Sequence, residues 1–248
     1  MKALAALALG AVLSAATGQE RPTLFLVGDS TMATRADADR NPEHGWGEML
    51  PRFLDDGVTV RNAAVNGRSS KSFMDEGRWA AVLAEIHPGD CVLVQFGHND
   101  QKREDPARYT DAHTGYRQNL LRYVAEARAN GASVVIASPI VRRRFDAAGV
   151  LEDTHGDYPA VAAQVARETG TPFVDLQQLS RGLVQSAGVE GSKALYVWLE
   201  PGQNAMHPQG RQDNTHLSAR GATEIARLAA RALRSTGLPI ARHVRTDG

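Results

Sequence analysis

Short apolar runs alternate with longer amphipathic segments along most of the chain. Glycine, proline and polar residues bound each short run, which is typical of a buried strand. Buried strands are predicted at residues 24–27, 58–65, 90–96, 133–137 and 172–175. Because these runs are apolar at nearly every position, they predict a parallel sheet that is covered on both faces.

The intervening segments carry apolar residues at helical spacing. Helices are predicted over residues 45–54, 79–86, 109–130, 158–169, 176–187 and 217–236. Strands that alternate with helices indicate an α/β fold with right-handed crossovers. Residues 32–43 are predicted to form a surface loop, residues 188–214 to be mostly irregular because they show no sustained period, and the tail from residue 237 to be loosely held.

The chain of 248 residues contains no internal linker, so a single domain is predicted over residues 22–236, with a C-terminal tail at 237–248. Lys2 is followed by an apolar run and then by small residues, which predicts a secretory signal peptide at residues 1–18. The apolar run is shorter than the roughly 20 residues of a membrane span. We therefore expect a secreted or periplasmic protein with no stable membrane association after removal of the signal.

The charge balance argues against nucleic-acid binding, and the cysteine content excludes an intrachain disulfide. The 28 Lys and Arg residues balance the 28 Asp and Glu residues, so nothing indicates binding to nucleic acid. Cys91 is the only cysteine and lies in a predicted strand, so no intrachain disulfide can form. Its expected role is that of a small buried hydrophobic residue.

Polar residues follow the first three predicted strands at their carboxyl ends. The three segments are Gly28-Asp29-Ser30-Thr31-Met32, Asn66-Gly67-Arg68-Ser69 and Gly97-His98-Asn99-Asp100. In a parallel sheet these ends share one edge, so we expect the three segments to converge on one cleft. A fourth polar segment, Asp213-Asn214-Thr215-His216, directly precedes the last predicted helix.

These residue types suit a serine hydrolase. A serine hydroxyl becomes a good nucleophile when an imidazole takes its proton, and a carboxylate holds that imidazole in one tautomer. Ser30, His216 and Asp213 are the candidates for these roles. The oxyanion of an ester reaction would be stabilised by the N–H groups of Ser30 and Gly67 and by the Asn99 amide.

Most of these residues also have a structural alternative. Gly67 is suited to a turn, Ser30, Asn99 and Asp213 to helix caps, and His98 to a structural role. The agreement of a nucleophile, a base and two donors favours the catalytic interpretation over these separate structural ones.

The four polar segments, together with Gly45-Trp46-Gly47 and Leu217-Ser218, resemble the sequence blocks of the SGNH (GDSL-type) hydrolase superfamily, and in particular rhamnogalacturonan acetylesterases. The resemblance extends from about residue 22 to residue 236. It implies a three-layer α/β/α, flavodoxin-like fold with a five-stranded parallel sheet. It also implies Ser30 as nucleophile, Asp213 and His216 as the acid–base pair, Gly67 and Asn99 as oxyanion donors, no metal or other cofactor, and an acetylated polysaccharide or oligosaccharide as substrate.

Other functions stay open at this point. The same superfamily contains thioesterases, lysophospholipases, aryl esterases and other carbohydrate deacetylases, so an acetylxylan or short-chain esterase is an alternative. A secreted carbohydrate-binding protein on a hydrolase scaffold is another. Gly-x-Ser-x-Gly, phosphate-loop and His-x-x-x-His motifs do not occur, which argues against an α/β-hydrolase elbow, a nucleotide binder and a metallohydrolase. The oligomeric state is not predictable from the sequence.

Three consecutive arginines follow the fourth predicted strand, at Arg142, Arg143 and Arg144. Their loop is expected to rise from the same sheet edge as Ser30. Arg142 and Arg143 are therefore predicted to bind the carboxylates of a uronic-acid polymer, for which a guanidinium has the matching geometry. The alternative is a solvated loop whose arginines form ordinary surface ion pairs.

Overall fold

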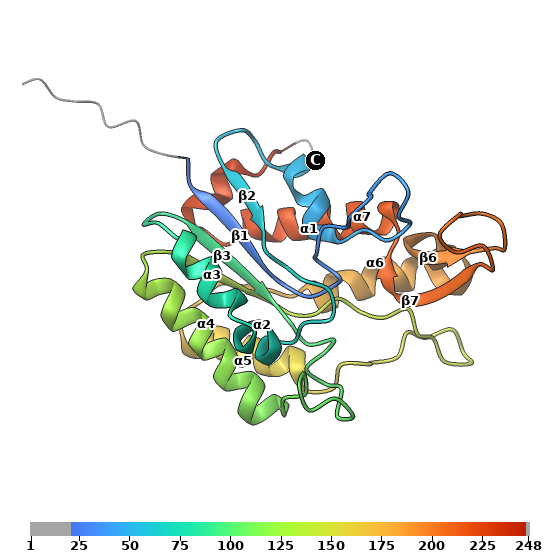
Figure 1. The fold of residues 1–248 in the computed structure, drawn as a ribbon, viewed down its shortest axis with the longest axis horizontal. Helices are drawn as coiled ribbons and strands as arrows, with labels where there is room; N and C mark the ends of the chain where they lie inside the picture. The colour runs from blue at the N-terminus through green and yellow to red at the C-terminus, as the bar shows by residue number, and fades with distance from the viewer. Residues whose placement is uncertain (1–20, 247–248) are drawn as a thin grey trace, which may run out of the picture.

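A parallel five-stranded sheet forms the centre of the molecule (Figure 1). The computed structural model describes residues 21–246, so the predicted signal peptide at residues 1–18 lies outside the described residues. The strands are β1 (Thr23–Gly28), β2 (Thr59–Asn62), β3 (Cys91–Gln95), β4 (Ser133–Ala137) and β5 (Phe173–Val174). Their order in the sheet is β2-β1-β3-β4-β5. The predicted α/β fold with a five-stranded parallel sheet is confirmed.

Helices cover both faces of this sheet, as Figure 1 shows. One layer contains α1 (Trp46–Met49), α6 (Leu176–Gly191) and α7 (Ala219–Arg234), and the other contains α2 (Ser70–Asp75), α3 (Arg78–Glu85), α4 (Arg117–Ala129) and α5 (Tyr158–Glu168). Successive residues of β1 alternate between the two layers, because side chains of a strand point to opposite faces. Leu24 and Leu26 belong to the core under α7, whereas Phe25 and Val27 belong to the core under α4.

A second, antiparallel sheet was not predicted. It consists of β6 (Tyr196–Leu199) and β7 (Arg211–Leu217), and α6 extends to Gly191 through a non-helical residue at Gly188. The prediction that residues 188–214 are mostly irregular is therefore wrong. Six polar residues precede Leu217 in β7, so the strand carries no apolar alternation by which it could be recognised.

Smaller differences occur at the helices. Residues 112–116 form a π-helical turn before α4, and α1 is followed by a 3₁₀ turn at Leu50–Phe53 that contains Pro51. The short helix α2 was not predicted. It begins with a capping box in which the Ser69 hydroxyl accepts the Ser72 N–H and the Ser72 hydroxyl accepts the Ser69 N–H.

The C-terminal segment packs against the domain as far as the structure describes it. A 3₁₀ helix spans Pro239–His243, Ile240 and Val244 are buried, and the Arg245 N–H donates to the Phe53 carbonyl at 2.9 Å. The expectation of a loosely held tail is therefore wrong for residues 237–246, because these apolar side chains complete the core beside α7. Within the described range, every helix falls short of the length and apolarity that crossing a bilayer requires.

Gly45 allows α1 to approach the turn that follows β1. A Cβ at this position would lie 2.2 Å from the Ala33 carbonyl oxygen and 2.4 Å from the Met32 carbonyl carbon. We predict that Gly45→Ala lowers the free energy of unfolding by about 1–3 kcal/mol, because backbone atoms rather than a flexible side chain must move. Urea denaturation measures this change.

Gly182→Ala in α6 is the matched control, since within the described residues the added methyl group meets no atom within 4 Å apart from its chain neighbours and the backbone of its own helix. This substitution should leave stability unchanged or raise it by up to about 1 kcal/mol. Identical unfolding midpoints for both variants would contradict the proposed close approach.

Candidate active site

A tight turn after β1 presents Ser30 at the carboxyl edge of the sheet. The Asp29 carboxylate accepts hydrogen bonds from the Thr31 N–H at 2.9 Å and the Thr31 hydroxyl at 2.8 Å, while the Asp29 carbonyl accepts from the Ala33 N–H at 3.0 Å. At Gly28 a Cβ would lie 2.8 Å from the Gln95 carbonyl oxygen of β3. Ser30 therefore stands beside the end of β3, at the point where the strand order of the sheet reverses.

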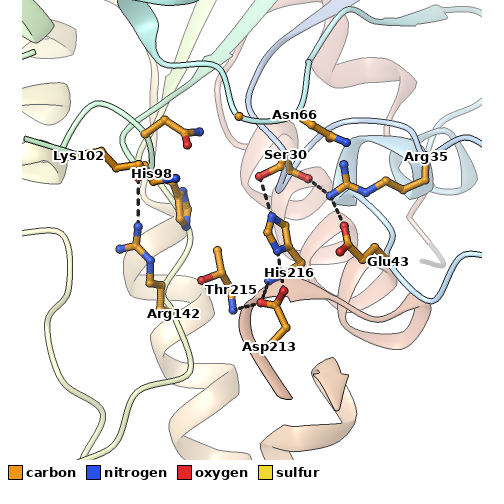
Figure 2. A pocket seen from close by; sticks show the side chains of 12 residues that line it. Ser30, Arg35, Glu43, Asn66, His98, Lys102, Arg142, Asp213, Thr215 and His216 are labelled. Atoms are coloured by element: carbon orange, nitrogen blue, oxygen red, sulfur yellow. Dashed lines mark hydrogen bonds and ion pairs between the residues drawn. The ribbon is translucent and has the colours of Figure 1, made fainter. Parts of the chain in front are cut away.

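The structure brings together the three residues predicted to form the triad (Figure 2). The Nε2 atom of His216 lies 3.0 Å from the Ser30 hydroxyl, and its Nδ1 atom lies 2.8 Å from Oδ2 of Asp213. Both Asp213 and His216 belong to β7 rather than to a loop. The three side chains form a continuous hydrogen-bonded line from carboxylate to hydroxyl.

The environment of Asp213 keeps its carboxylate ionised. Burial alone would raise the pKa of this carboxyl, but hydrogen bonds from the His216 ring and from the N–H groups of His216 and Thr215 hold the pKa well below its usual range. An ionised acceptor at Oδ2 requires His216 to donate from Nδ1. Nε2 then carries the lone pair that can accept the Ser30 proton.

Three predicted oxyanion donors border the same cleft. Gly67 has φ +74, a left-handed conformation that favours glycine, and Asn99 donates one amide hydrogen to the Arg68 carbonyl at 3.0 Å. The second amide hydrogen of Asn99 remains available. Within residues 21–246, the N–H groups of Ser30 and Gly67 have no hydrogen-bond acceptor. These N–H groups and the amide can stabilise an oxyanion beside the hydroxyl.

The cleft has a volume of about 560 Å³ and a polar lining. Its walls are formed by Ser30, Arg35, Glu43, Asn66, Gly67, His98, Asn99, Lys102, Arg142, Asp213, Thr215 and His216. None of these lining residues has an apolar side chain. The cleft therefore offers hydrogen-bonding groups to a substrate but no surface for a long hydrocarbon chain.

The three consecutive arginines have different positions. Arg142 lines the cleft, and its guanidinium donates to the carbonyl groups of His98 and Thr154, both at 3.2 Å. Arg144 is exposed and forms an ion pair with Glu152 at 2.6 Å. Of the two arginines predicted to bind substrate, only Arg142 lies where that prediction requires.

Arg143 does not face the cleft, which corrects its predicted role. Its side chain is buried, donates to Asn214 Oδ1 at 3.0 Å and Ser192 Oγ at 3.0 Å, and lies 4.5 Å above the Trp198 ring. These contacts attach the β6–β7 hairpin to the rest of the domain. Arg143 points away from the cleft because its guanidinium bonds to Ser192 and Asn214 and packs on Trp198.

Sequence reasoning missed three charged residues of the cleft. Arg35 and Glu43 lie in the loop between β1 and α1, and Lys102 follows the Gly97–Asp100 turn. Both loops follow the carboxyl ends of strands that the sequence predicts to share one edge of the sheet. This position is the signal from which the three residues could have been found. Neither Lys102 nor Arg142 forms an ion pair with any described residue. Burial and the nearby charges of Arg108 and Arg142 lower the pKa of Lys102.

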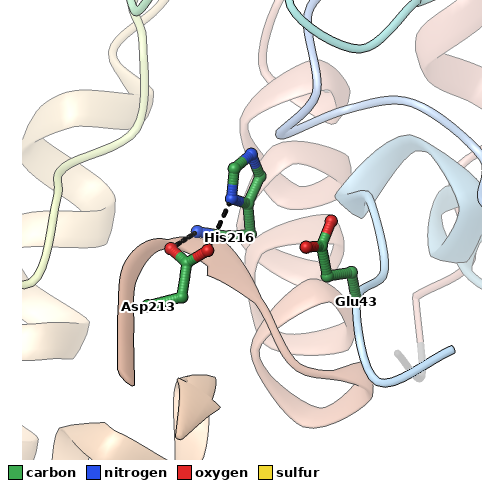
Figure 3. Close-up of side chains that lie close together, drawn as sticks. All are labelled: Glu43, Asp213 and His216. Carbon is green, nitrogen blue, oxygen red and sulfur yellow. Dashed lines mark hydrogen bonds and ion pairs between the residues drawn. The ribbon is translucent and has the colours of Figure 1, made fainter. Parts of the chain in front are cut away.

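One group in the described chain has the composition of a metal site. Ligand atoms of Glu43, Asp213 and His216 lie within 4.8 Å of one another (Figure 3). Arg211 already forms ion pairs with both carboxylates, and both ring nitrogens of His216 have hydrogen-bond partners. A metal ion would have to displace the guanidinium and break the triad, so the donor set does not fit one.

Comparisons with known proteins identify the family of this chain. The sequence model of the GDSL-like Lipase/Acylhydrolase family matches residues 26–223. The chain is 39% identical over 221 residues to the rhamnogalacturonan acetylesterase RhgT of Bacillus subtilis, covering 89% of this chain and 93% of that protein. It is 26% identical over 238 residues to a rhamnogalacturonan acetylesterase of Emericella nidulans, covering 88% of this chain and 87% of that protein.

Solved structures show the same fold. The Bacillus subtilis protein YxiM has a TM-score of 0.72 at 28% identity, and the match covers 88% of this chain but only 58% of that chain. An acetylxylan esterase from Geobacillus stearothermophilus has a TM-score of 0.60 at 20% identity, covering 91% of this chain and 97% of that chain. At 20% identity, the match to the acetylxylan esterase shows the fold alone.

Asp100 connects the two loops that carry the oxyanion donors, and its ionisation should affect stability. Its Oδ1 accepts the Ser70 N–H at 3.0 Å and the Thr110 hydroxyl at 3.1 Å, and burial raises the pKa of this carboxyl to about 7. Between about pH 4 and 7 the folded protein keeps a proton that the unfolded chain loses. The resulting stabilisation is complete below about pH 4 and is lost as the pH rises to about 7.

We predict that Asp100→Asn removes this contribution. From pH 4 to pH 7 the wild-type protein should lose up to roughly 4 kcal/mol of unfolding free energy relative to the variant, the equivalent of about three pKa units. Urea denaturation at pH 4, 5.5, 7 and 8 measures the difference. Parallel stability profiles for the two proteins would show that Asp100 is ionised throughout.

Proposed function

The chain belongs to the GDSL-like lipase/acylhydrolase family and is a carboxylic ester hydrolase, and we propose that it removes O-acetyl groups from a rhamnogalacturonan-type pectic polysaccharide. Its similarity to two acetylesterases of Bacillus subtilis supports a carbohydrate acetylesterase. The observation that carries the proposal is the line from Asp213 through His216 to Ser30, which ends in a cleft without apolar side chains.

The proposed reaction proceeds through an acetyl-enzyme. His216 Nε2 accepts the Ser30 proton while Oγ forms a bond to the acetyl carbonyl carbon. The oxyanion receives hydrogen bonds from the N–H groups of Ser30 and Gly67 and from the free Asn99 amide hydrogen. The imidazolium then protonates the sugar oxygen as its bond to the carbonyl carbon breaks.

The second half of the reaction regenerates the serine. His216 takes a proton from water, and the resulting hydroxide adds to the acetyl carbon. Collapse of this second intermediate breaks the bond to Ser30, which regains its proton from the imidazolium, and acetate leaves. Asp213 stays ionised and holds the imidazole in place in both halves.

The lining of the cleft favours a short acyl group on a sugar. Each methylene that leaves water for an apolar pocket contributes about 0.8 kcal/mol, and this cleft offers no such pocket. Sugar hydroxyls instead find amide and hydroxyl partners such as Asn66 and Thr215. The lining therefore favours acetyl esters of carbohydrates as substrates over esters of long fatty acids.

Lys102 and Arg142 support a substrate that carries carboxylates. Both cations line the cleft, neither forms an ion pair with a residue that the structure describes, and they lie on the side opposite Arg35 and Glu43 (Figure 2). A uronic-acid residue next to the acetylated sugar would supply a carboxylate for them. Galacturonate units of a pectic backbone meet this requirement, whereas a neutral xylan backbone does not.

We also propose that the protein is exported. The sequence of residues 1–18 supports this, because a lysine is followed by an apolar run and then by small residues. Expression of the full chain in a bacterial host, followed by fractionation and N-terminal sequencing, tests the proposal. A mature protein that begins near residue 19 outside the cytoplasm is the expected result, and an intact N-terminus in the cytoplasm would contradict it.

Ser30→Ala should abolish esterase activity without affecting the fold. We expect kcat on an aryl acetate to fall by about four orders of magnitude or more, because no other described hydroxyl bonds to His216. Ser186→Ala, at an exposed position on α6, is the control and should behave like wild type. Retention of substantial hydrolysis by Ser30→Ala would exclude the proposed nucleophile.

Lys102→Gln should reduce hydrolysis of charged substrates selectively. For an acetylated galacturonate oligosaccharide, kcat/KM should fall about tenfold, while the value for a neutral aryl acetate should stay within about twofold. Arg122→Gln on α4, outside the cleft, is the control cation. Equal losses on both substrates would indicate a structural role for Lys102, and faster acetate release from xylan than from pectin by wild type would contradict the pectic substrate.

A further inference from the structure

Arg211 joins the carboxylate of the triad to a second carboxylate. Its Nη2 atom lies 2.6 Å from Asp213 Oδ2, the same oxygen that receives the His216 hydrogen bond. Its Nη1 atom lies 2.5 Å from Glu43 Oε1. Glu43 lies on the opposite side of the His216–Asp213 pair from Lys102 and Arg142, as Figure 2 shows.

The second oxygen of Glu43 continues the connection back to the nucleophile. Glu43 Oε2 lies 3.1 Å from Arg35 Nη2, and this nitrogen donates to the Ser30 carbonyl at 2.8 Å (Figure 2). These hydrogen bonds and ion pairs therefore form a closed path. We use the name charge ring for the closed path through Ser30, His216, Asp213, Arg211, Glu43 and Arg35.

The charge ring connects two parts of the chain that no β-sheet ladder joins. Ser30, Arg35 and Glu43 belong to the loop between β1 and α1, whereas Arg211 and Asp213 belong to β7. Outside the ring, the His44 N–H donates to the Leu217 carbonyl at 3.0 Å, and the Asn204 amide in the connection before β7 donates to the Arg40 carbonyl at 3.2 Å. Apart from the Ser30–His216 bond, the ring thus adds the Glu43–Arg211 ion pair to the polar contacts that hold the loop with the nucleophile against the strand with the base.

Because the charges of the ring are partly buried and alternate in sign, the loss of any one residue should destabilise the position of the others. The Arg35 side chain is 2% exposed and that of Glu43 is 15% exposed. Burial lowers the pKa of Arg35, and the carboxylates of Glu43, Asp29 and Glu48 counter that effect. Two guanidinium groups alternate with two carboxylates, so removal of one partner leaves its neighbours with less compensation for their buried charges.

We propose that Glu43 and Arg211 act together as positioning residues that hold Asp213 and the Ser30 backbone in catalytic register, and that Arg35 anchors this pair to the nucleophile. The inference rests on the proposed serine mechanism. Neither Glu43 nor Arg211 exchanges a proton with the substrate. Because Glu43 and Arg211 act as one unit, the loss of either residue should lower kcat by nearly as much as the loss of both.

A double-mutant cycle with a neutral aryl acetate tests the proposal. Glu43→Gln and Arg211→Gln should each lower kcat about tenfold with KM within twofold, and the double variant should be no more than about twofold slower than the slower single variant. Arg61→Gln and Glu85→Gln, which break an exposed pair outside the cleft, form the control cycle and should leave kcat unchanged.

The pH profile of kcat separates this role from a general loss of stability. Removing the Arg211 charge favours protonation of the neighbouring imidazole, so the acid limb should move to higher pH by a few tenths of a unit, and Glu43→Gln should move it to lower pH. The double variant should return toward the wild-type position. Arg35, His98, Lys102 and Arg142, the other charged or titratable groups around the imidazole in the cleft, are unchanged in all three variants.

Several results would overturn the proposal. Losses that multiply in the double variant would mean that the two residues act independently, and an effect confined to KM would make Glu43 a substrate-binding residue. If Arg211→Gln does not fold, Arg211→Lys serves in the same cycle, because an ammonium lacks the two-sided geometry of the guanidinium and should also lower kcat. If Ser30→Ala remains active, the serine mechanism itself fails. If it is inactive while Glu43→Gln matches wild type, only the positioning role fails.

Discussion

The hydrogen bond between His216 and Ser30 is the interaction on which the candidate site depends, and it joins residues 186 positions apart in the chain. Ser30 is placed by β1, whose neighbours in the sheet are β2 and β3. His216 is placed by β7, which continues directly through Ser218 into α7 and so into the core on one face of the sheet. A contact of 3.0 Å between these groups therefore requires both the sheet and its covering helix to be folded.

The sheet edge that carries the site is unusually polar for a buried region. Asp29, Thr31, His98 and Asp100 are all buried. Nδ1 of His98 faces Oδ2 of Asp29 at 3.4 Å, and within the described chain Nε2 of His98 and Oδ2 of Asp100 lack hydrogen-bond partners. Such groups are costly to bury. The two apolar cores on either side of the sheet offset this cost, and the polar groups hold the turns that carry Ser30 and Asn99 in fixed positions.

Much of this arrangement could be predicted because the underlying signals are local. The apolar runs of β1, β3 and β4 specify buried parallel strands, and polar segments at their carboxyl ends must then share one edge. The sequence could not show the direction in which Arg143 points, because that depends on contacts with Trp198 of the distant β6–β7 hairpin and with Ser192 in the turn before it. Strand β7 and the charge ring could not be predicted either. Polar residues lie on both faces of β7, so its sequence shows no hydrophobic period.

The most direct test of the account is to trap the covalent intermediate. Wild-type protein mixed with excess aryl acetate and quenched in acid within the first turnover should yield one peptide heavier by one acetyl group, and that peptide should contain Ser30. Tandem mass spectrometry should place the acetyl group on the Ser30 oxygen, and the label should be absent from Ser30→Ala and disappear as turnover is completed. Acetate release without any labelled peptide, or stable labelling of another residue with turnover intact, would contradict the serine mechanism.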